Sequence, residues 1–210
     1  GNWNPNATRN FSPLGVGGLG GLNVGKIHPK TQLKIISITS ENLAFDNQID
    51  FEKMVLPNGE IGEIIVAGEH VLKQYFRNEK AWKENKIPVE NEVWHRTGDS
   101  GFIGDNGNLY LTGRCKQLIK TESGWLSPFI FENQLQEMKG IEIGTILSID
   151  NQLVIVCEIS KEVSENLIKK QIQTTFKDRF DRVEFLKKIP RDPRHNSKID
   201  YLKLEKLIRH

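Results

Sequence analysis

The stretch Trp94-His95-Arg96-Thr97-Gly98-Asp99 lies a short distance before Gly113-Arg114-Cys115-Lys116, and Asn196-Ser197-Lys198-Ile199-Asp200 follows near the C-terminus. Each segment alone is a weak signal, because Gly and Asp are common in ordinary turns. Asp99 nevertheless offers a carboxylate, which can accept hydrogen bonds from two neighbouring hydroxyls of a ligand. Hydrogen bonds to a charged group contribute about 1.5–3 kcal/mol each. The order and spacing of the three segments make them more informative together than singly.

Composition and charge narrow the classes of function. A chain of 210 residues can form one or two domains with a hydrophobic core, and 29 Lys+Arg nearly balance 27 Asp+Glu. Residues 161–210 hold 14 Lys/Arg and 8 Asp/Glu, a net charge of +6 that leaves −4 for the rest. This basic part lacks interleaved aromatic residues and nucleic-acid motifs, so we expect no nucleic-acid partner. A basic lobe suits a substrate that carries phosphate.

Cysteine and histidine usage argues against a disulfide framework and a structural metal site. Cys115 and Cys157 are the only cysteines, and neither lies in a metal-binding spacing with the five scattered histidines. No apolar run approaches the roughly 20 residues of a membrane span, and the N-terminus lacks a signal-peptide pattern. The default expectation is a soluble cytoplasmic protein.

Hydrophobic patterning predicts a strand-rich first part. We expect strands over residues 33–38 and 61–67, a helix over residues 78–86 with Asn78 as its N-cap, and a loop over the first 25 residues. Two short apolar runs, 101–103 and 108–111, flank an Asn-Gly pair, which is a strong hairpin signal.

The pattern changes after Arg114. Ser127-Pro128 predicts the start of a helix that runs to about residue 138, because Ser caps and Pro fits the first turn. Two apolar runs, 142–149 and 153–159, predict a second hairpin. Further elements are a helix over residues 162–177, a strand over 183–186 and a helix from Asp200. The apolar stripe of the 162–177 helix comprises Val163, Leu167, Ile168, Ile172 and Phe176.

The segment Gly20–Lys26 satisfies the phosphate-loop pattern G-x-x-x-x-G-K, but its context is wrong. Ile27 stands where Ser or Thr would hold magnesium, and Pro29 interrupts the helix that should follow. We therefore interpret this segment as a loop.

In their order and spacing, the three segments quoted first resemble consecutive signatures of the adenylate-forming synthetases, the family that includes acyl-CoA ligases. The resemblance implies an enzyme that uses ATP to join a carboxylic acid to AMP and then passes the acyl group on, typically to CoA. It also implies an α+β fold, with a strand-rich end of the large domain followed by a small mixed α/β domain. Residues 1–113 would belong to the large domain, residues 114–116 to a hinge and residues 117–210 to the small, mobile domain.

The resemblance assigns roles to five residues. Asp99 and Arg114 would hold the nucleotide ribose, and Lys116 would be the hinge. Gly124, within the 120–126 loop, would lie on the side of the acyl acceptor. Lys198 would stabilise the charge that develops when AMP is transferred, although Ser197 precedes it where the family usually has Gly. The alternatives remain open: Asp99 in an ordinary turn, Lys116 as a surface lysine and Lys198 as a solvated residue of the basic tail.

Finer features are similar to the fatty-acyl branch, above all to the olefin β-lactone synthetases. These features are Tyr75-Phe76-Arg77-Asn78, Lys86-Ile87-Pro88 and Pro193–Ile199. The implied acid is a fatty or β-hydroxy fatty acid. Alternatives are lactone closure without CoA and a non-catalytic interaction module that retains the fold.

The family's Ser/Thr/Gly-rich phosphate loop and its Thr-Glu segment do not occur in the printed sequence. Both lie upstream in such enzymes, so the sequence resembles the C-terminal portion of one. We expect the 210 residues alone to be inactive, and Mg²⁺ to bind only together with the upstream domain. These segments do not indicate the chain length of the acid, the identity of the acyl acceptor or the oligomeric state.

Overall fold

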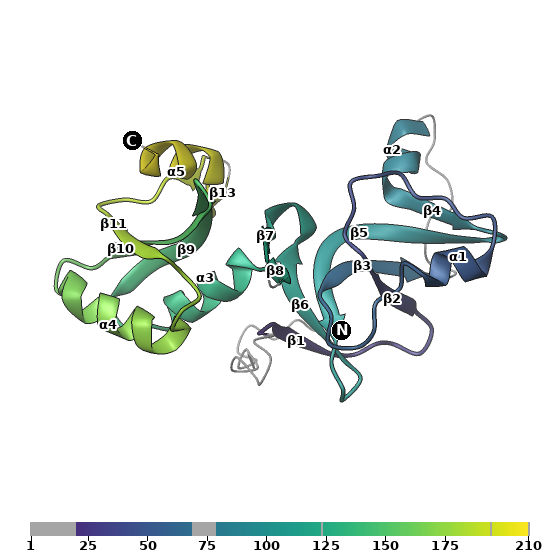
Figure 1. Cartoon of the computed structure of the whole chain (residues 1–210), viewed down its shortest axis with the longest axis horizontal. Helices are drawn as coiled ribbons and strands as arrows, with labels where there is room; N and C mark the ends of the chain where they lie inside the picture. The colour runs from purple at the N-terminus through teal and green to yellow at the C-terminus, as the bar shows by residue number, and fades with distance from the viewer. Residues whose placement is uncertain (1–19, 69–78, 123, 194, 210) are drawn as a thin grey trace. The chain divides into compact units, whose positions relative to one another are not determined.

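The computed structural model describes residues 20–68, 79–122, 124–193 and 195–209. The chain forms two compact units, Gly1–Leu118 and Ile119–His210 (Figure 1). The first is dominated by strands and the second mixes helices with strands, which confirms the α+β expectation. The expected hinge, residues 114–116, lies shortly before the end of the first unit, and its hinge role stays a prediction.

The first unit is built on one antiparallel sheet in the order β1-β6-β5-β3-β2, with β4 also paired to β5. Its strands are β1 (Leu22–Lys26), β2 (Gln32–Ile36), β3 (Gly62–Ala67), β4 (Lys86–Val89), β5 (Glu92–Ile103) and β6 (Asn108–Arg114). The short helices are α1 (Gln48–Glu52), α2 (Glu79–Asn85) and the 3-10 turn η1 (Cys115–Gln117). Its core gathers Ile36, Phe51, Ile65, Ala67, Ile87, Val89 and Trp94.

The hairpin between β5 and β6 forms as the sequence predicts. Gly107 adopts φ +74°, a conformation that an L side chain rarely takes. The turn closes through hydrogen bonds from Gly107 N to Gly104 O, 2.8 Å, and from Gly104 N to Asn108 O, 2.9 Å. This hairpin matters for function, because Asp99 within β5 and Arg114 at the end of β6, both singled out by the family resemblance, are register partners on its two strands.

The second unit has a three-stranded sheet in the order β11-β10-β9, in which β10 is antiparallel to β9 and parallel to β11. Its strands are β7 (Ile119–Thr121), β8 (Gly124–Leu126), β9 (Ile141–Ile149), β10 (Gln152–Ile159), β11 (Arg182–Leu186), β12 (Arg191–Asp192) and β13 (His195–Ile199). Its helices are α3 (Pro128–Gln136), α4 (Glu165–Phe176) and α5 (Tyr201–Ile208).

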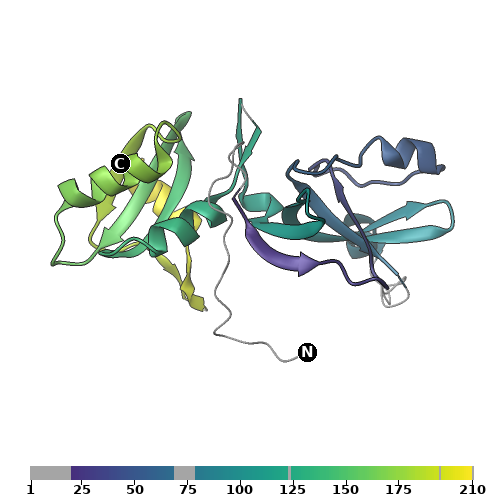
Figure 2. The same cartoon turned by 90° about the horizontal axis from the view of Figure 1, so that it is seen from below.

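Helices cover both faces of this small sheet (Figures 1 and 2). On one face, Leu135 of α3 and Ile172 of α4 pack with Ile155 of β10. On the other, Leu204 of α5 packs with Val156. The alternation along β10 sends successive side chains to opposite faces, so one apolar strand serves two cores. None of the helices in the described part is long and apolar enough to cross a membrane.

Side-chain caps set the starts of the three helices of the second unit. Ser127 Oγ accepts from Ile130 N at 3.3 Å, and Ser164 Oγ accepts from Leu167 N at 3.3 Å. Asp200 caps α5 in the same way. Each satisfies a backbone donor that the first helical turn leaves without a partner. The predicted Ser127 cap is confirmed, and the 162–177 helix begins later than expected because Ser164 is its cap.

The expectation of a loop at the glycine-rich segment is wrong. Residues 22–26 form β1, which pairs with β6 through Leu22 and Leu111. A bulge at Gly25, φ +90°, is held by a hydrogen bond from its N–H to Asn23 Oδ1. The local composition disfavours a strand, but the neighbouring strand supplies the pairing. The next element is β2 and not a helix, so the segment lacks the context of a phosphate loop.

Leu167 departs from the predicted buried stripe of α4. Its side chain is 52% exposed, because the helix turns it away from the sheet that buries Ile168, Ile172 and Phe176. The N-cap assigned to Asn78 and the Tyr75–Asn78 motif lie outside the described residues, as does the expected loop up to residue 19.

Candidate functional site

The segment Thr97-Gly98-Asp99 forms a bulge within β5. The ladder with β3 pairs Ile65 with Arg96 and Glu63 with Ser100, so three residues of β5 face a single residue of β3. Gly98 adopts φ +69° at the centre of the bulge. The alternative of an ordinary turn is therefore wrong, since the segment lies inside a strand. Bulges of this kind re-aim side chains beside functional sites.

Side-chain hydrogen bonds compensate for the interrupted ladder. Thr97 Oγ1 donates to Ile64 O at 2.7 Å and accepts from Asp99 N at 3.1 Å. Glu63 Oε1 accepts from Gly98 N at 3.3 Å. Backbone groups that lose their strand partners thus find side-chain partners, which removes the cost of leaving them unsatisfied. The conformation of the bulge is held by a threonine on it and a glutamate behind it.

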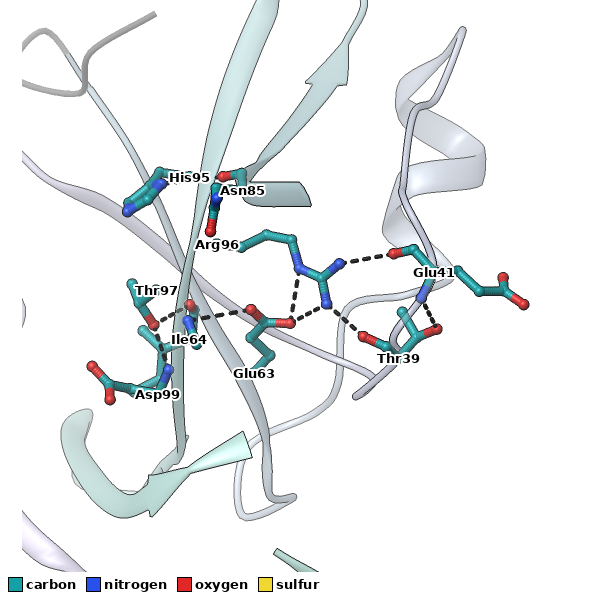
Figure 3. Close-up of polar contacts among 10 residues, drawn as sticks. Thr39, Glu41, Glu63, Ile64, Asn85, His95, Arg96, Thr97 and Asp99 are labelled. Atoms are coloured by element: carbon teal, nitrogen blue, oxygen red, sulfur yellow. Dashed lines mark hydrogen bonds and ion pairs between the residues drawn. The ribbon is translucent and has the colours of Figure 1, made fainter. Parts of the chain in front are cut away.

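Glu63 and Arg96 form a buried ion pair behind the bulge (Figure 3). Their side chains are 3% and 10% exposed, and Arg96 Nε and Nη2 donate to Glu63 Oε2 at 3.0 and 2.6 Å. Arg96 also donates to the carbonyls of Thr39, 2.6 Å, and Glu41, 2.8 Å. Breaking a buried pair by removing one partner typically costs about 3–5 kcal/mol. The pair joins β3, β5 and the segment after β2.

Asp99 and Arg114 lie opposite each other on β5 and β6. Arg114 Nε is 3.0 Å from Asp99 Oδ1, and Arg114 Nη1 is 3.4 Å from the Thr97 carbonyl oxygen. The Arg114 and Asp99 side chains are 64% and 38% exposed, so the pair contributes only about 0–1 kcal/mol and can rearrange around a ligand. In Figure 3 the Asp99 carboxylate points away from the Glu63–Arg96 pair.

This arrangement suits a sugar that carries hydroxyls. Within the described residues, only Oδ1 of the Asp99 carboxylate has a side-chain partner. Oδ2 can therefore accept from a ligand hydroxyl, while the exposed Arg114 guanidinium can donate to a second oxygen. The described residues contain no group of three His, Cys, Asp or Glu that could hold a metal ion. The donor set thus fits a ribose.

His95, inside the same motif, faces β4. Its Nδ1 lies 3.1 Å from the Asn85 carbonyl oxygen, and it pairs across the strands with the buried Lys86. Burial, followed by the nearby charge of Lys86, lowers the pKa of His95. A neutral ring that presents an N–H to the carbonyl fits these contacts. Among the described residues, the Asn85 carbonyl and not a carboxylate is the hydrogen-bond partner of the His95 ring, so these contacts give His95 a structural role.

Lys116 lies exposed in η1, immediately after β6. The residues on either side of η1, Arg114 and Leu118, are extended, with ψ 136° and 139°. Burial, together with the carboxylates of Glu63 and Asp99, raises the pKa of the adjacent Cys115 to about 12. A raised pKa favours the neutral thiol, which is a weaker nucleophile than the thiolate. The expected hinge residue therefore occupies a single helical turn between two extended stretches.

Gly124 is at the turn between β7 and β8, where it adopts φ +121°. Thr121 Oγ1 donates to Gly124 O at 2.9 Å, and the two residues are register partners. The exposed glycine gives the hairpin a conformation that other residues adopt only with strain. Its role beside the acyl acceptor stays a prediction.

Lys198 lies exposed on β13, in the ribbon that pairs with β12. Within the described part of the chain, no carboxylate lies within ion-pair distance of it. Lys203 differs, because its Nζ lies 2.9 Å from Asp200 Oδ2. The two lysines are close in sequence but only Lys198 is available for a ligand. Asp99 and Arg114 thus come together in the first unit, whereas Gly124 and Lys198 belong to the second.

A partly buried polar cluster links the start of α5 to α3 and β9. The Tyr201 hydroxyl donates to Glu132 Oε1, and Thr145 Oγ1 donates to the same oxygen at 2.8 Å. Burial raises the pKa of Glu132, although both hydrogen bonds oppose this effect. Burial and the charge of Glu132 raise the pKa of Tyr201. The cluster therefore contains an acid whose ionisation is costly.

We expect Glu132→Gln to remove a pH dependence of stability. Because folding raises the pKa of Glu132 above its ordinary value of 4.5, its contribution is fully present below pH 4.5 and is lost as pH rises through the folded pKa. The loss is about 1.4 kcal/mol for each pH unit between the two pKa values. Gln keeps an acceptor for Tyr201 and Thr145. Urea unfolding of both proteins between pH 4 and 8, followed at amide signals of β9 and β10, should show the wild type losing stability relative to the variant. Parallel curves would contradict this assignment.

Glu63 is the residue of this site that the sequence motifs do not reveal. It stands in the apolar run 61–67, whose pattern predicts a strand and nothing more. One feature of the sequence could have identified Glu63. It is an acidic residue at a position that strand alternation places in the interior, and a buried carboxylate requires a partner. Arg96 lies in the first motif, but its pairing with Glu63 depends on strand register.

No model of a protein family matches the chain. It is 31% identical over 147 residues to 4-coumarate-CoA ligase 1 of Narcissus pseudonarcissus, covering 66% of this chain and 26% of the relative. It is 44% identical over 80 residues to oxalate–CoA ligase of Saccharomyces cerevisiae, covering 38% and 14%. The fold is similar to ATP-bound MatB from Rhodopseudomonas palustris, with a TM-score of 0.62 and 21% identity over 88% of this chain and 35% of that chain.

The chain spans about a quarter of the length of the 4-coumarate-CoA ligase that it matches. These two relatives are named for different acids, 4-coumarate and oxalate, but both are named as CoA ligases. Sequence identity and fold agree with the family resemblance stated from the sequence. The chain belongs to the family of AMP-forming acyl-CoA ligases and corresponds to their C-terminal portion.

Proposed function

We propose that this chain is the C-terminal portion of a ligase that activates a fatty or β-hydroxy fatty acid as its acyl adenylate and passes the acyl group on, typically to CoA. The observation that carries the proposal is the pair of Asp99, in the bulge of β5, and Arg114, at the end of the neighbouring strand β6. Both belong to the family's nucleotide signatures, and their exposed donor and acceptor groups match a ribose. Structures with ATP bound exist among proteins of this fold.

In the first half-reaction, a carboxylate oxygen of the acid attacks the α-phosphorus of ATP, and the bond to pyrophosphate breaks. Asp99 accepts hydrogen bonds from the ribose hydroxyls, and Arg114 donates to the same nucleotide. The ammonium of Lys198 stabilises the negative charge that develops between acyl oxygen and α-phosphate. In the second half-reaction, a nucleophile such as the CoA thiolate attacks the acyl carbon, and AMP leaves.

The two half-reactions need different groups beside the adenylate. Lys116 is the proposed hinge about which the second unit turns between them, and the hairpin with Gly124 at its turn is the proposed acceptor-side loop. Mg²⁺ would neutralise the charge of the departing pyrophosphate and would be held by residues upstream of this chain.

The choice of acid rests on the resemblance of Lys86-Ile87-Pro88 and the Pro193–Ile199 segment to the fatty-acyl branch. The two curated relatives are named for 4-coumarate and oxalate, so the acid varies within the family. The same terminal segment favours lactone closure without CoA as a second candidate. Product analysis with a β-hydroxy acid, with and without CoA, separates the two: a lactone formed without CoA supports the second.

Replacing Asp99 with Ala in a complete ligase that carries this chain tests the proposal. We expect KM for ATP to rise about 10- to 100-fold, because hydrogen bonds to a charged acceptor are lost. KM for the acid should change little. The measurement is carboxylate-dependent exchange of labelled pyrophosphate into ATP. The 210-residue chain alone is the blank, since we expect it to support no exchange.

Asp105→Ala is the matched control, because Asp105 is an exposed aspartate in the turn of the same hairpin. It removes the same charge without touching the Asp99–Arg114 pair. An equal KM for ATP in the two variants would refute the ribose role of Asp99. Exchange catalysed by the 210-residue chain would show that the activity needs no upstream part.

A further inference from the structure

The buried Glu63 is connected to the proposed ribose acceptor by two short routes. Its Oε1 accepts from Gly98 N at 3.3 Å, on the residue just before Asp99. Its Oε2 accepts from Arg96, the residue that precedes the bulge. Figure 3 shows the Glu63 side chain between Arg96 and the segment that carries Thr97 and Asp99. One side chain therefore holds both the centre of the bulge and the residue before it.

The conformation of the bulge depends on these hydrogen bonds. Gly98 has φ +69°, and a Cβ placed there meets no atom within 4 Å, so packing of side chains does not hold this residue in place. Removing the bulge would shift the register of β5 against β3 and turn the Asp99 side chain. The hydrogen bond that Thr97 donates to Ile64 O and the one that Glu63 accepts from Gly98 N oppose that change.

The charge of Glu63 is also necessary for Arg96. The guanidinium is held at its far end by the carbonyls of Thr39 and Glu41, which are neutral acceptors. Glu63 supplies the negative charge that makes its burial tolerable. With three donors of Arg96 anchored, the start of the bulge has little freedom to rotate.

From these contacts we infer that Glu63 is a positioning residue for the nucleotide: it fixes the bulge so that the Asp99 carboxylate meets the ribose hydroxyls. This inference rests on the proposed function. Glu63 touches no substrate itself, so its effect must disappear when the ribose has no hydroxyls to meet. That dependence separates a positioning role from a general contribution to folding.

The test uses the complete ligase and compares ATP with 2′,3′-dideoxy-ATP. The variant is Glu63→Gln, because an amide has one acceptor oxygen and cannot serve both Arg96 and Gly98 N. We expect kcat/KM for ATP to fall about tenfold. For the dideoxy analogue it should be unchanged. In the background of Asp99→Ala, Glu63→Gln should add nothing, which a double-mutant cycle measures.

Two companion variants keep the outcome interpretable. Glu63→Asp retains the charge for Arg96 but is shorter by one methylene, so it withdraws from Gly98 N. The same comparison of nucleotides is made with Glu63→Asp if Glu63→Gln does not fold. Glu60→Gln removes an exposed carboxylate shortly before β3 and should behave as the wild type.

Equal losses with ATP and with the dideoxy analogue would overturn the inference, as would no loss with either. If Asp99→Ala discriminates between the two nucleotides and the Glu63 variants do not, only the inference fails. If Asp99→Ala does not discriminate, the ribose role of Asp99 fails and the inference falls with it.

Discussion

Lys198→Ala in the complete ligase is expected to slow acyl adenylate formation about 10²–10³-fold, the usual scale for the loss of one preorganised donor to a transition state. Lys198 is exposed on β13 and, among the described residues, has no carboxylate partner that would have to be displaced. An ammonium on a long flexible stem can therefore reach a developing negative charge. Pyrophosphate exchange and single-turnover formation of the adenylate measure the effect.

The variant should separate the two half-reactions. Binding of the acid should change little, because the ammonium acts where charge develops and not on the ground-state chain. Supplied with preformed acyl adenylate, the variant should transfer the acyl group at almost the normal rate. A comparable loss in both half-reactions would show that Lys198 supports the fold or binds substrate in general.

The structure decides which lysine is the proper control. Lys203 lies in the same basic tail, but it is ion-paired with Asp200, the N-cap of α5, so its removal would also disturb the helix start. Lys206 is exposed on α5 and has no carboxylate partner in the described part of the chain. Lys206→Ala removes the same charge from a helix that tolerates Ala. If it slows adenylation as much as Lys198→Ala does, Lys198 is an ordinary solvated lysine.

Elements with strong local signals were predictable from the sequence. Ser127-Pro128 marks the start of α3 because its cap and its first turn are specified by adjacent residues. The hairpin of β5 and β6 follows in the same way from an Asn-Gly pair between apolar runs. In each case the decisive interactions lie within a few residues of chain.

Features that depend on a distant partner were not predictable. β1 contains Gly and Asn and forms because β6 lies beside it. The direction of Leu167 depends on which side of α4 meets the sheet, a choice that the helical period leaves open over a wide stripe. Tertiary pairing overrides the local preference at both positions.

In the candidate site, too, residues within local motifs were predictable, whereas a residue that depends on a distant partner was not. Asp99, Arg114 and Lys198 could be named from their motifs, and the structure adds that the first two face each other across a strand pair. The role of Glu63 follows only from the register of β3 against β5, where residues far apart in sequence become neighbours. A sequence motif identifies residues that contact the ligand more readily than it identifies the residues that position them.

Lys116→Pro is the second change with a large expected effect. The ring fixes φ near −65°, a value typical of a 3-10 turn such as η1, so the variant is compatible with the φ of this conformation. A hinge must take up a second backbone conformation, and forcing Pro into an incompatible one costs about 3 kcal/mol or more. We therefore expect one half-reaction to fall about 10²-fold further than the other. Separate assays of adenylate formation and of acyl transfer from preformed adenylate provide the measurement.

Lys116→Ala separates the backbone from the side chain in this experiment. It removes the ammonium of an exposed residue and leaves φ free, so a hinge that works through the backbone should keep both half-reactions within about threefold of the wild type. Some cost of Lys116→Pro falls on Cys115, because the residue before Pro is disfavoured in the helical region that η1 requires. That cost is common to both half-reactions and cancels in their ratio. The ratio is therefore the decisive quantity: a value near that of the wild type would place the hinge elsewhere, whereas a large change seen with Pro and not with Ala would locate the rotation at the backbone of Lys116.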